Sequence, residues 1–165
     1  METDQLTGKL VVLKPLNQSY INAYLAAFSP MVRLQVQADS LEAERAYLQD
    51  RLERQQHEED TLFYCVFNRV TNQLIGALEL RNRYTSRGQL YCWLHEHYWG
   101  GGFFQEALAL ASRAYFIKSG NLFFNAHVDK TNKRSYYALK KGGFADSGIV
   151  RGPCGLQYEL ILRRK

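Results

Sequence analysis

Three consecutive glycines, Gly100-Gly101-Gly102, separate two apolar segments, and no other part of the sequence narrows the possible folds as much. The segment before them, residues 89–94, is short and rich in leucine and aromatic residues, which predicts a strand. The segment after them is apolar nearly all round at 107–111 and stops near Lys118, which predicts a helix buried on several sides. We therefore expect a strand, a glycine loop and a helix in direct succession.

Such a loop supports two interpretations. Glycine lacks a Cβ, so the backbone can approach a ligand, and the N–H groups at a helix start favour phosphate oxygens. Glycines can also serve only to let the chain turn, and the loop alone leaves both interpretations open. Two common phosphate motifs are excluded, because a P-loop needs Gly-Lys-Ser/Thr and the dinucleotide motif needs a third glycine where Gln105 stands.

The remaining pattern predicts seven strands and four helices in the order βααβββαβαββ. Strands are expected at 9–13, 61–67, 73–81, 89–94, 122–128, 145–150 and 156–162. Helices are expected at 20–28 with Ser19 as cap, from Ser40 to the polar stretch 55–60, at 102–118 and at 132–141. Turns at 71–72 and 86–88 favour an antiparallel meander, and the segments 30–38 and 84–88 are interpreted as loops. Without a linker or repeat, residues 1–165 are expected to form one domain.

Composition and charge limit the possible partners. The N-terminus is polar and no long apolar run follows, so neither a signal peptide nor a membrane partner is expected. Three cysteines cannot all pair, which favours a reducing compartment, and we expect a cytoplasmic protein. The formal charge of +5 is dispersed along the chain, which favours ordinary solubility over nucleic-acid binding. His95 and His97 with Glu96 make a weak zinc signal, so no metal is expected.

Two groups of residues carry a resemblance to a known family. Residues 90–108, with Tyr98, Trp99, Gly100, Gly102 and Glu106 in register, resemble the acetyl-CoA motif of GNAT N-acetyltransferases. About thirty residues on, Asn132-Lys133-Arg134-Ser135 and Gly143-Phe144 resemble that family's Asn-x-x-Ser and Gly-Phe. The chain looks most like the Rim-type branch, whose members acetylate ribosomal-protein N-termini. It departs from that pattern at Gly101, where lysine is usual, and at His97, where glutamine or arginine is usual.

The resemblance implies an α+β fold of three layers, α/β/α, with a mixed, mostly antiparallel sheet splayed between its fourth and fifth strands. It implies acetyl-CoA as co-substrate and an amine acceptor, either a protein N-terminus or a small molecule, with direct transfer in a ternary complex by a monomer or homodimer. The pantetheine arm would enter the splay, and the pyrophosphate would lie on the loop. The residues implied in cofactor binding are Trp93, Leu94, Trp99, Gly100, Gly101, Gly102, Phe103, Phe104, Asn132 and Ser135.

The catalytic residues are less closely indicated. A backbone N–H near Trp93 or Leu94 is the expected oxyanion donor. Many relatives use a tyrosine seven residues after the asparagine to protonate the thiolate, but Leu139 stands there, so Ser135 becomes the candidate acid, unless it only caps or packs in its helix.

The candidate bases are Glu79 and His127. Glu79 could instead be an outward, solvated strand residue, and His127 could be a satisfied core residue. A catalytically idle acyl-CoA-binding module remains the alternative function.

Overall fold

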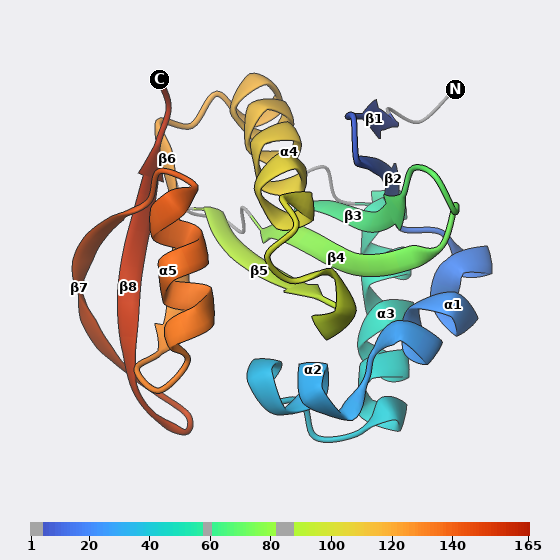
Figure 1. Ribbon diagram of the computed structural model, residues 1–165, viewed down its shortest axis with the longest axis horizontal. Coiled ribbons are helices and arrows are strands. Elements are labelled where there is room, and N and C mark those ends of the chain that lie inside the picture. Colours follow the sequence, from blue (N-terminus) through green and yellow to red (C-terminus); the bar gives the residue numbers. More distant parts are fainter. Residues whose placement is uncertain (1–4, 58–60, 82–87) are drawn as a thin grey trace.

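The computed structural model describes residues 5–57, 61–81 and 88–165, and Figure 1 shows three layers. The helices are α1 (Ile21–Ala27), α2 (Pro30–Val36), α3 (Leu41–His57), α4 (Phe103–Ser119) and α5 (Lys133–Lys141), with short 3₁₀ turns at Gln18–Tyr20 and Glu96–Tyr98. The strands are β1 (Leu6–Thr7), β2 (Val11–Pro15), β3 (Thr61–Asn68), β4 (Leu74–Arg81), β5 (Gly88–Leu94), β6 (Phe123–Asp129), β7 (Ala145–Gly152) and β8 (Gly155–Arg163). No helix in the described ranges is long and apolar enough to cross a membrane.

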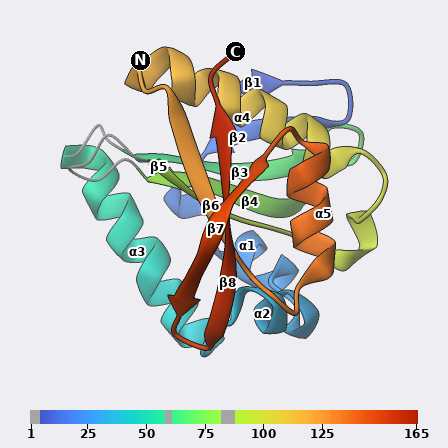
Figure 2. The same ribbon diagram turned by 90° about the vertical axis from the view of Figure 1, so that its left-hand side faces the viewer.

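The strands form one mixed sheet in the order β1-β2-β3-β4-β5-β6-β8-β7. Every neighbouring pair is antiparallel except β5 and β6, which are parallel. Their pairing covers only Gly88 to Leu90 against Phe124 to Ala126. Figure 2 shows β6, β8 and β7 running nearly across the direction of β3, β4 and β5. The two strands therefore part after Leu90, and the predicted splay is confirmed.

Each face of the sheet has its own apolar core. On one face, α4 and α5 cover a cluster that includes Leu90, Leu94, Ala111 and Leu139. On the other face, α1, α2 and α3 cover a second cluster to which Trp93 belongs. Because successive strand residues point to opposite faces, β5 sends Leu90, Cys92 and Leu94 to the α4 face and Tyr91 and Trp93 to the other.

The structure departs from the predicted elements at the N-terminal side. The sheet has eight strands, because the two-residue β1 pairs Leu6 with Leu13, and two residues are too few to leave a periodic pattern. Residues 30–36 form helix α2, where we expected a loop. Asn17 rather than Ser19 caps the turn that precedes α1, because its side chain accepts the Ser19 N–H. Helix α3 ends at His57, within the polar stretch 55–60 where we expected its end, and residues 58–60 and 86–87 lie outside the described residues.

Candidate functional site

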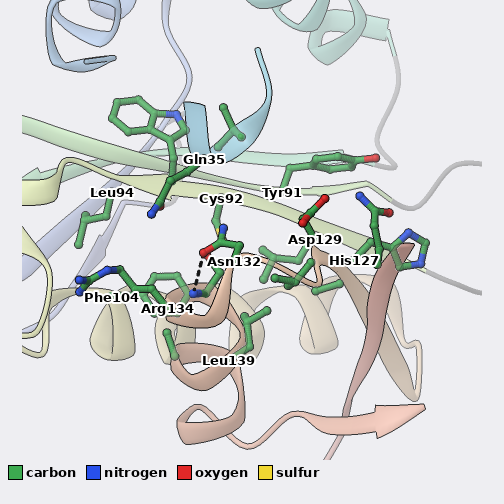
Figure 3. A pocket seen from close by; sticks show the side chains of 18 of the residues that line it. Gln35, Tyr91, Cys92, Leu94, Phe104, His127, Asp129, Asn132, Arg134 and Leu139 are labelled. Carbon is green, nitrogen blue, oxygen red and sulfur yellow. Dashed lines mark hydrogen bonds between the residues drawn. The ribbon is translucent and has the colours of Figure 1, made fainter. Parts of the chain in front are cut away.

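A cavity of about 840 Å³ lies where β5 and β6 part. Tyr91 to Leu94 of β5 and His127 to Asp129 of β6 form two of its walls. Figure 3 shows Asn132, Arg134 and Leu139 on the α5 side and Gln35 of α2 on the opposite side of β5. The cavity thus passes through the sheet and connects its two faces. A volume of this size is within the range typical of small-molecule sites.

The glycine loop borders the cavity on the α4 side. Gly100 and Gly102 both line it, with φ values of +82° and +87°, a left-handed conformation that favours glycine. Gly102 is the N-cap residue of α4 and provides no side-chain hydrogen bond to the first turn. A Cβ on Gly100 would have no heavy atom within 4 Å, so open space lies beside this backbone. The N–H groups at the start of a 17-residue helix are therefore accessible to an anion from the cavity.

Trp99 fixes the loop to the end of β5. Its indole Nε1 donates to the Leu94 carbonyl at 2.7 Å, and the Arg134 guanidinium lies 4.4 Å from the ring centroid. Arg134 lines the cavity from α5, as does Lys141. Two cations thus face the region of the glycine loop, which itself contains neither lysine nor arginine from Leu94 to Phe104.

The start of α5 forms the opposite lip. Asn132 is its N-cap residue, and its Oδ1 accepts the Ser135 N–H at 3.2 Å, the bond drawn in Figure 3. The side-chain amide nitrogen is thereby turned away from the helix. Ser135 is half-buried and lines the cavity, whereas Leu139 is buried in the core. Tyr137 also lines the cavity, while the Tyr136 hydroxyl donates to Asp146.

The backbone of β5 offers hydrogen-bonding groups to the gap. The His95 N–H donates to the Ile75 carbonyl of the strand on the other edge. Because alternate residues direct their N–H groups to the same edge of a strand, the Trp93 N–H also faces β4, and the Leu94 N–H faces the gap. Trp93 also lines the cavity, and its indole Nε1 donates to the Tyr24 hydroxyl at 2.9 Å.

Glu79 is buried but lies away from the cavity. Its carboxylate accepts from Arg81 Nε at 2.8 Å and from the Tyr47 hydroxyl, and it pairs with Arg51 at 3.2 Å. With 3% of its surface exposed, it is not the solvated strand residue that we considered as the alternative. Within the described residues it is also absent from the cavity lining. Its observed role is to neutralise two arginines beneath α3.

His127 lines the cavity from β6 and lies between two partners. Its Nε2 is 2.9 Å from Glu159 of β8, and its Nδ1 is 3.2 Å from the Gln89 side-chain amide. Glu159 also accepts the Ser147 hydroxyl at 3.1 Å. A proton on Nε2 would satisfy the carboxylate and leave the Nδ1 lone pair directed to the Gln89 amide. The imidazole is thus oriented, and its basic nitrogen lies on the Gln89 side.

The buried Cys65 and the half-buried Cys92 are thiols and not thiolates. Burial raises the pKa of Cys92, which lines the cavity, to about 12, and does the same for Cys65. A thiol with so high a pKa is a poor nucleophile at neutral pH. Cys92, the cysteine of the β5 wall, is therefore not an activated nucleophile.

The cavity brings together most of the predicted site residues. Eight predicted cofactor residues line it, namely Trp93, Leu94, Trp99, Gly100, Gly102, Phe104, Asn132 and Ser135, together with the predicted base His127. Gly101 and Phe103 do not line it, and the Phe103 ring packs on Tyr98 at 5.3 Å. The sequence interpretation missed Arg134, although it lies inside the Asn132–Ser135 motif. It also missed Gln35 and Gln37, because it assigned no helix to 30–36, and it missed Asp129 at the end of β6.

A comparison with protein families gave a match over most of the chain. The acetyltransferase (GNAT) domain family matches residues 11–145. A search of curated proteins gave no match.

Several solved structures share the fold. The ribosomal-protein-S5-alanine acetyltransferase from Vibrio fischeri superposes with a TM-score of 0.80 at 16% identity, over 98% of this chain and 97% of that one. RimL, a ribosomal L7/L12 alpha-N-protein acetyltransferase in complex with coenzyme A, superposes with a TM-score of 0.82 at 15% identity. The match covers 97% of this chain and 98% of that one. Mycobacterium smegmatis RimJ in complex with CoA-disulfide superposes with a TM-score of 0.78 at 15% identity. The match covers 97% of this chain and 87% of that one.

Proposed function

Because the chain belongs to the GNAT acetyltransferase family, we propose that it transfers an acetyl group from acetyl-CoA to a primary amine. The observation that carries this proposal is the cavity that crosses the sheet between β5 and β6. One end of it meets an uncapped helix start and two cations, and the other end meets a separate wall formed by α2. Two reactants can therefore reach the same gap from opposite faces of the sheet.

The residues on the α4 and α5 side fit a CoA thioester. The open backbone at Gly100 and Gly102 and the first-turn N–H groups of α4 would hold the diphosphate, with Arg134 and Lys141 opposite. The free edge of β5 and the Asn132 side-chain amide would hydrogen-bond the amides of the pantetheine arm. The thioester supplies an activated acetyl group. In that position its carbonyl oxygen requires a donor, and the gap-facing Leu94 N–H is the donor that the strand provides.

Proton transfer falls to His127 and Ser135. We assign the base to His127 and not to Glu79, because His127 lines the cavity and Glu79 is committed to Arg51 and Arg81. The Gln89 amide would leave Nδ1, the proton of the acceptor ammonium would pass to that nitrogen, and Glu159 would stabilise the imidazolium that results. Ser135, on the α5 side, is the hydroxyl available to protonate the departing thiolate.

Direct transfer in a ternary complex fits the cavity better than a covalent enzyme intermediate. An acetyl-enzyme route needs an activated nucleophile at the thioester, and burial keeps Cys92 protonated. Because the cavity opens on both faces of the sheet, the acetyl donor and the acceptor can be bound together, and no acetyl-enzyme intermediate is needed. The cysteines are unpaired in the structure, which supports our expectation of a reducing, cytoplasmic setting.

The acceptor is proposed to be a protein N-terminus. Two of the structural neighbours named above are ribosomal-protein acetyltransferases by name, and exposed apolar side chains line the cavity on the α2 side. Val36 of α2 and Tyr91 of β5 both line the cavity there and are exposed by 39% and 43%. A polypeptide provides apolar contacts beyond the amine that a small amine lacks.

A specific observation favours a second candidate, an acyl-CoA-binding module without turnover. The position seven residues after Asn132 is Leu139, which is buried and provides no proton. Both candidate functions require binding of an acyl-CoA, but only the enzyme releases CoA when an acceptor amine is present.

Isothermal titration with acetyl-CoA comes first, and the absence of heat with any acyl-CoA refutes both candidates. A thiol-release assay over peptides with free N-termini and small amines comes second. Release of CoA above the hydrolytic background supports the enzyme, whereas binding without release over the whole panel supports the module.

A further inference from the structure

Asp129 presents a fixed carboxylate to the cavity from the end of β6. Its Oδ1 accepts both the backbone N–H of Thr131 at 2.8 Å and the Thr131 hydroxyl at 2.6 Å. These two bonds prevent the side chain from turning away, so Oδ2 keeps one direction. Figure 3 shows the carboxylate directed toward the wall that carries Tyr91 and Gln35.

The second oxygen has a single long hydrogen bond across the cavity. Gln37 Nε2 donates to Asp129 Oδ2 at 3.3 Å, near the limit for such a bond. Gln37 follows α2 directly and has a left-handed backbone with φ of +57°, which is uncommon for a residue other than glycine. Both Gln37 and Asp129 line the cavity. A weak donor therefore occupies a carboxylate oxygen that could accept a stronger one.

The charge at this position is negative and its neighbours are mostly neutral. The hydrogen bonds from Thr131 lower the pKa of Asp129, and the hydrogen bond from Gln37 lowers it to a smaller extent. The Asp129 carboxyl group is therefore an anion at neutral pH. Around it on this side lie Gln35, Tyr91 and Gln157. The cations Arg134 and Lys141 belong to the α5 side, and Arg151 lies at the β7–β8 hairpin.

Asp129 and His127 lie on the same face of β6, since they are two residues apart. An ammonium group bound at Asp129 would lie next to the imidazole that our assignment makes the base. A charged hydrogen bond from such a group is also stronger than the neutral one from Gln37.

We propose that Asp129 Oδ2 is the docking point of the acceptor, which enters as a cation and takes the place of the Gln37 amide. This inference rests on the proposed function and narrows it. The acceptor class is an amine that is protonated when it binds and that reaches Asp129 from the α2 side. Asp129 acts here as a specificity-determining residue, and His127 then removes the proton.

Asp129 also has a structural role, and one substitution separates the two. Asp129→Asn keeps an oxygen for the Thr131 N–H and hydroxyl, so the turn into α5 is preserved. It removes the charge and places an amide donor where the acceptor ammonium would bind. If the role of Asp129 were only structural, Asp129→Asn would leave amine affinity unchanged, because the Thr131 bonds and the backbone bond from Asn132 to the Asp129 carbonyl are kept.

The test measures amine binding to CoA-saturated protein by isothermal titration. The probes are trialanine amide and 1,4-diaminobutane, with N-acetyl-trialanine amide as the uncharged control. For wild-type protein we expect a free-amine probe to bind and the acetylated control not to bind. Binding of the peptide alone indicates a protein N-terminus, and binding of the diamine alone indicates a small amine.

Asp129→Asn is expected to weaken binding of the amine probe about tenfold, the size of one charge-assisted hydrogen bond, with the Kd for CoA unchanged within about threefold. Gln37→Ala is expected to leave amine affinity equal or higher, because it removes the competing donor. Equal amine affinity in wild type and Asp129→Asn overturns the inference, and so does wild-type protein that binds CoA but neither amine. Failure to bind CoA refutes the proposed function, and the inference with it.

Discussion

Gly100 and Gly120 form a matched pair that separates the cost of strain from the cost of a blocked cavity. Both have a left-handed backbone, with φ of +82° and +69°, and a Cβ on either would have no heavy atom within 4 Å. Gly100 lines the cavity near the start of α4, whereas Gly120 ends that helix and is not among the lining residues of the described chain. Alanine therefore brings equal strain to both positions but an added methyl to the cavity only at Gly100.

The expected magnitudes follow from this geometry. A left-handed alanine costs about 1–2 kcal/mol of folding free energy. The reduced freedom of the unfolded chain offsets about 0.4–1 kcal/mol of that cost. Each variant should thus lose about 1 kcal/mol, or about 2–4 °C in Tm for a domain of this size. For Gly100→Ala alone we expect the Kd for CoA to rise at least about tenfold, which corresponds to about 1.4 kcal/mol.

Isothermal titration with CoA measures the Kd of each variant. Unfolding of the same preparations in urea measures the free energy of unfolding. Gly120→Ala should match the stability loss of Gly100→Ala and keep the wild-type Kd within about twofold. If both variants are folded and bind CoA equally well, the glycine loop does not contact the cofactor. The diphosphate assignment would then have to be abandoned, whatever the stability data show.

Three further predictions concern single side chains. Glu106→Ala should lower the free energy of unfolding by about 1–3 kcal/mol in urea, because the carboxylate accepts the backbone N–H groups of residues 9–11 at 2.5–2.9 Å; an unchanged midpoint would contradict this. Ser135→Ala should reduce kcat at least about a hundredfold with any acceptor found in the screen, with the Kd for acetyl-CoA within about threefold; full activity would leave Ser135 as a helix residue only. Burial raises the pKa of Glu44, so its contribution to stability is full below its ordinary value of 4.5 and is lost as the pH rises through the raised value. Glu44→Gln, which still accepts the Tyr24 hydroxyl, should therefore gain stability relative to wild type between pH 4 and pH 8 in urea unfolding, and a constant difference would refute the assignment.

The strand, glycine loop and helix could be predicted because each has a local signal. Glycine needs no long-range partner to adopt a positive φ, and the run of alanine and leucine at 107–111 consists of strong helix formers. Helix α2 left a weaker signal. Ser29 and Pro30 are good residues for a helix start, and the Ser29 hydroxyl accepts the Val32 N–H at 3.2 Å. Only Val32 of this helix is buried, so no apolar stripe identified it.

The position of Glu79 could not be predicted from its own strand. The run 74–80 is buried on both faces, so alternation does not indicate which side the carboxylate takes. Its partners are Arg51 and Tyr47, from a helix about thirty residues earlier in the chain. A pairing of this kind depends on how α3 packs on the sheet, which no local pattern determines. Asp129 was missed for a similar reason, because its partner Gln37 lies more than ninety residues away.

The glycine loop cannot hold its own shape, because glycine has the greatest backbone freedom of all residues. Its flanking residues hold it from three directions. Trp99 donates to the Leu94 carbonyl before the loop, and after it Gln105 donates to the Ala138 carbonyl of α5. Glu106 binds the N–H groups of residues 9–11. These side chains bond β5, α5 and the N-terminal hairpin, so the loop is already in place before a ligand arrives. A site ordered in advance loses less entropy on binding, and this order favours the diphosphate site that we propose for the three glycines.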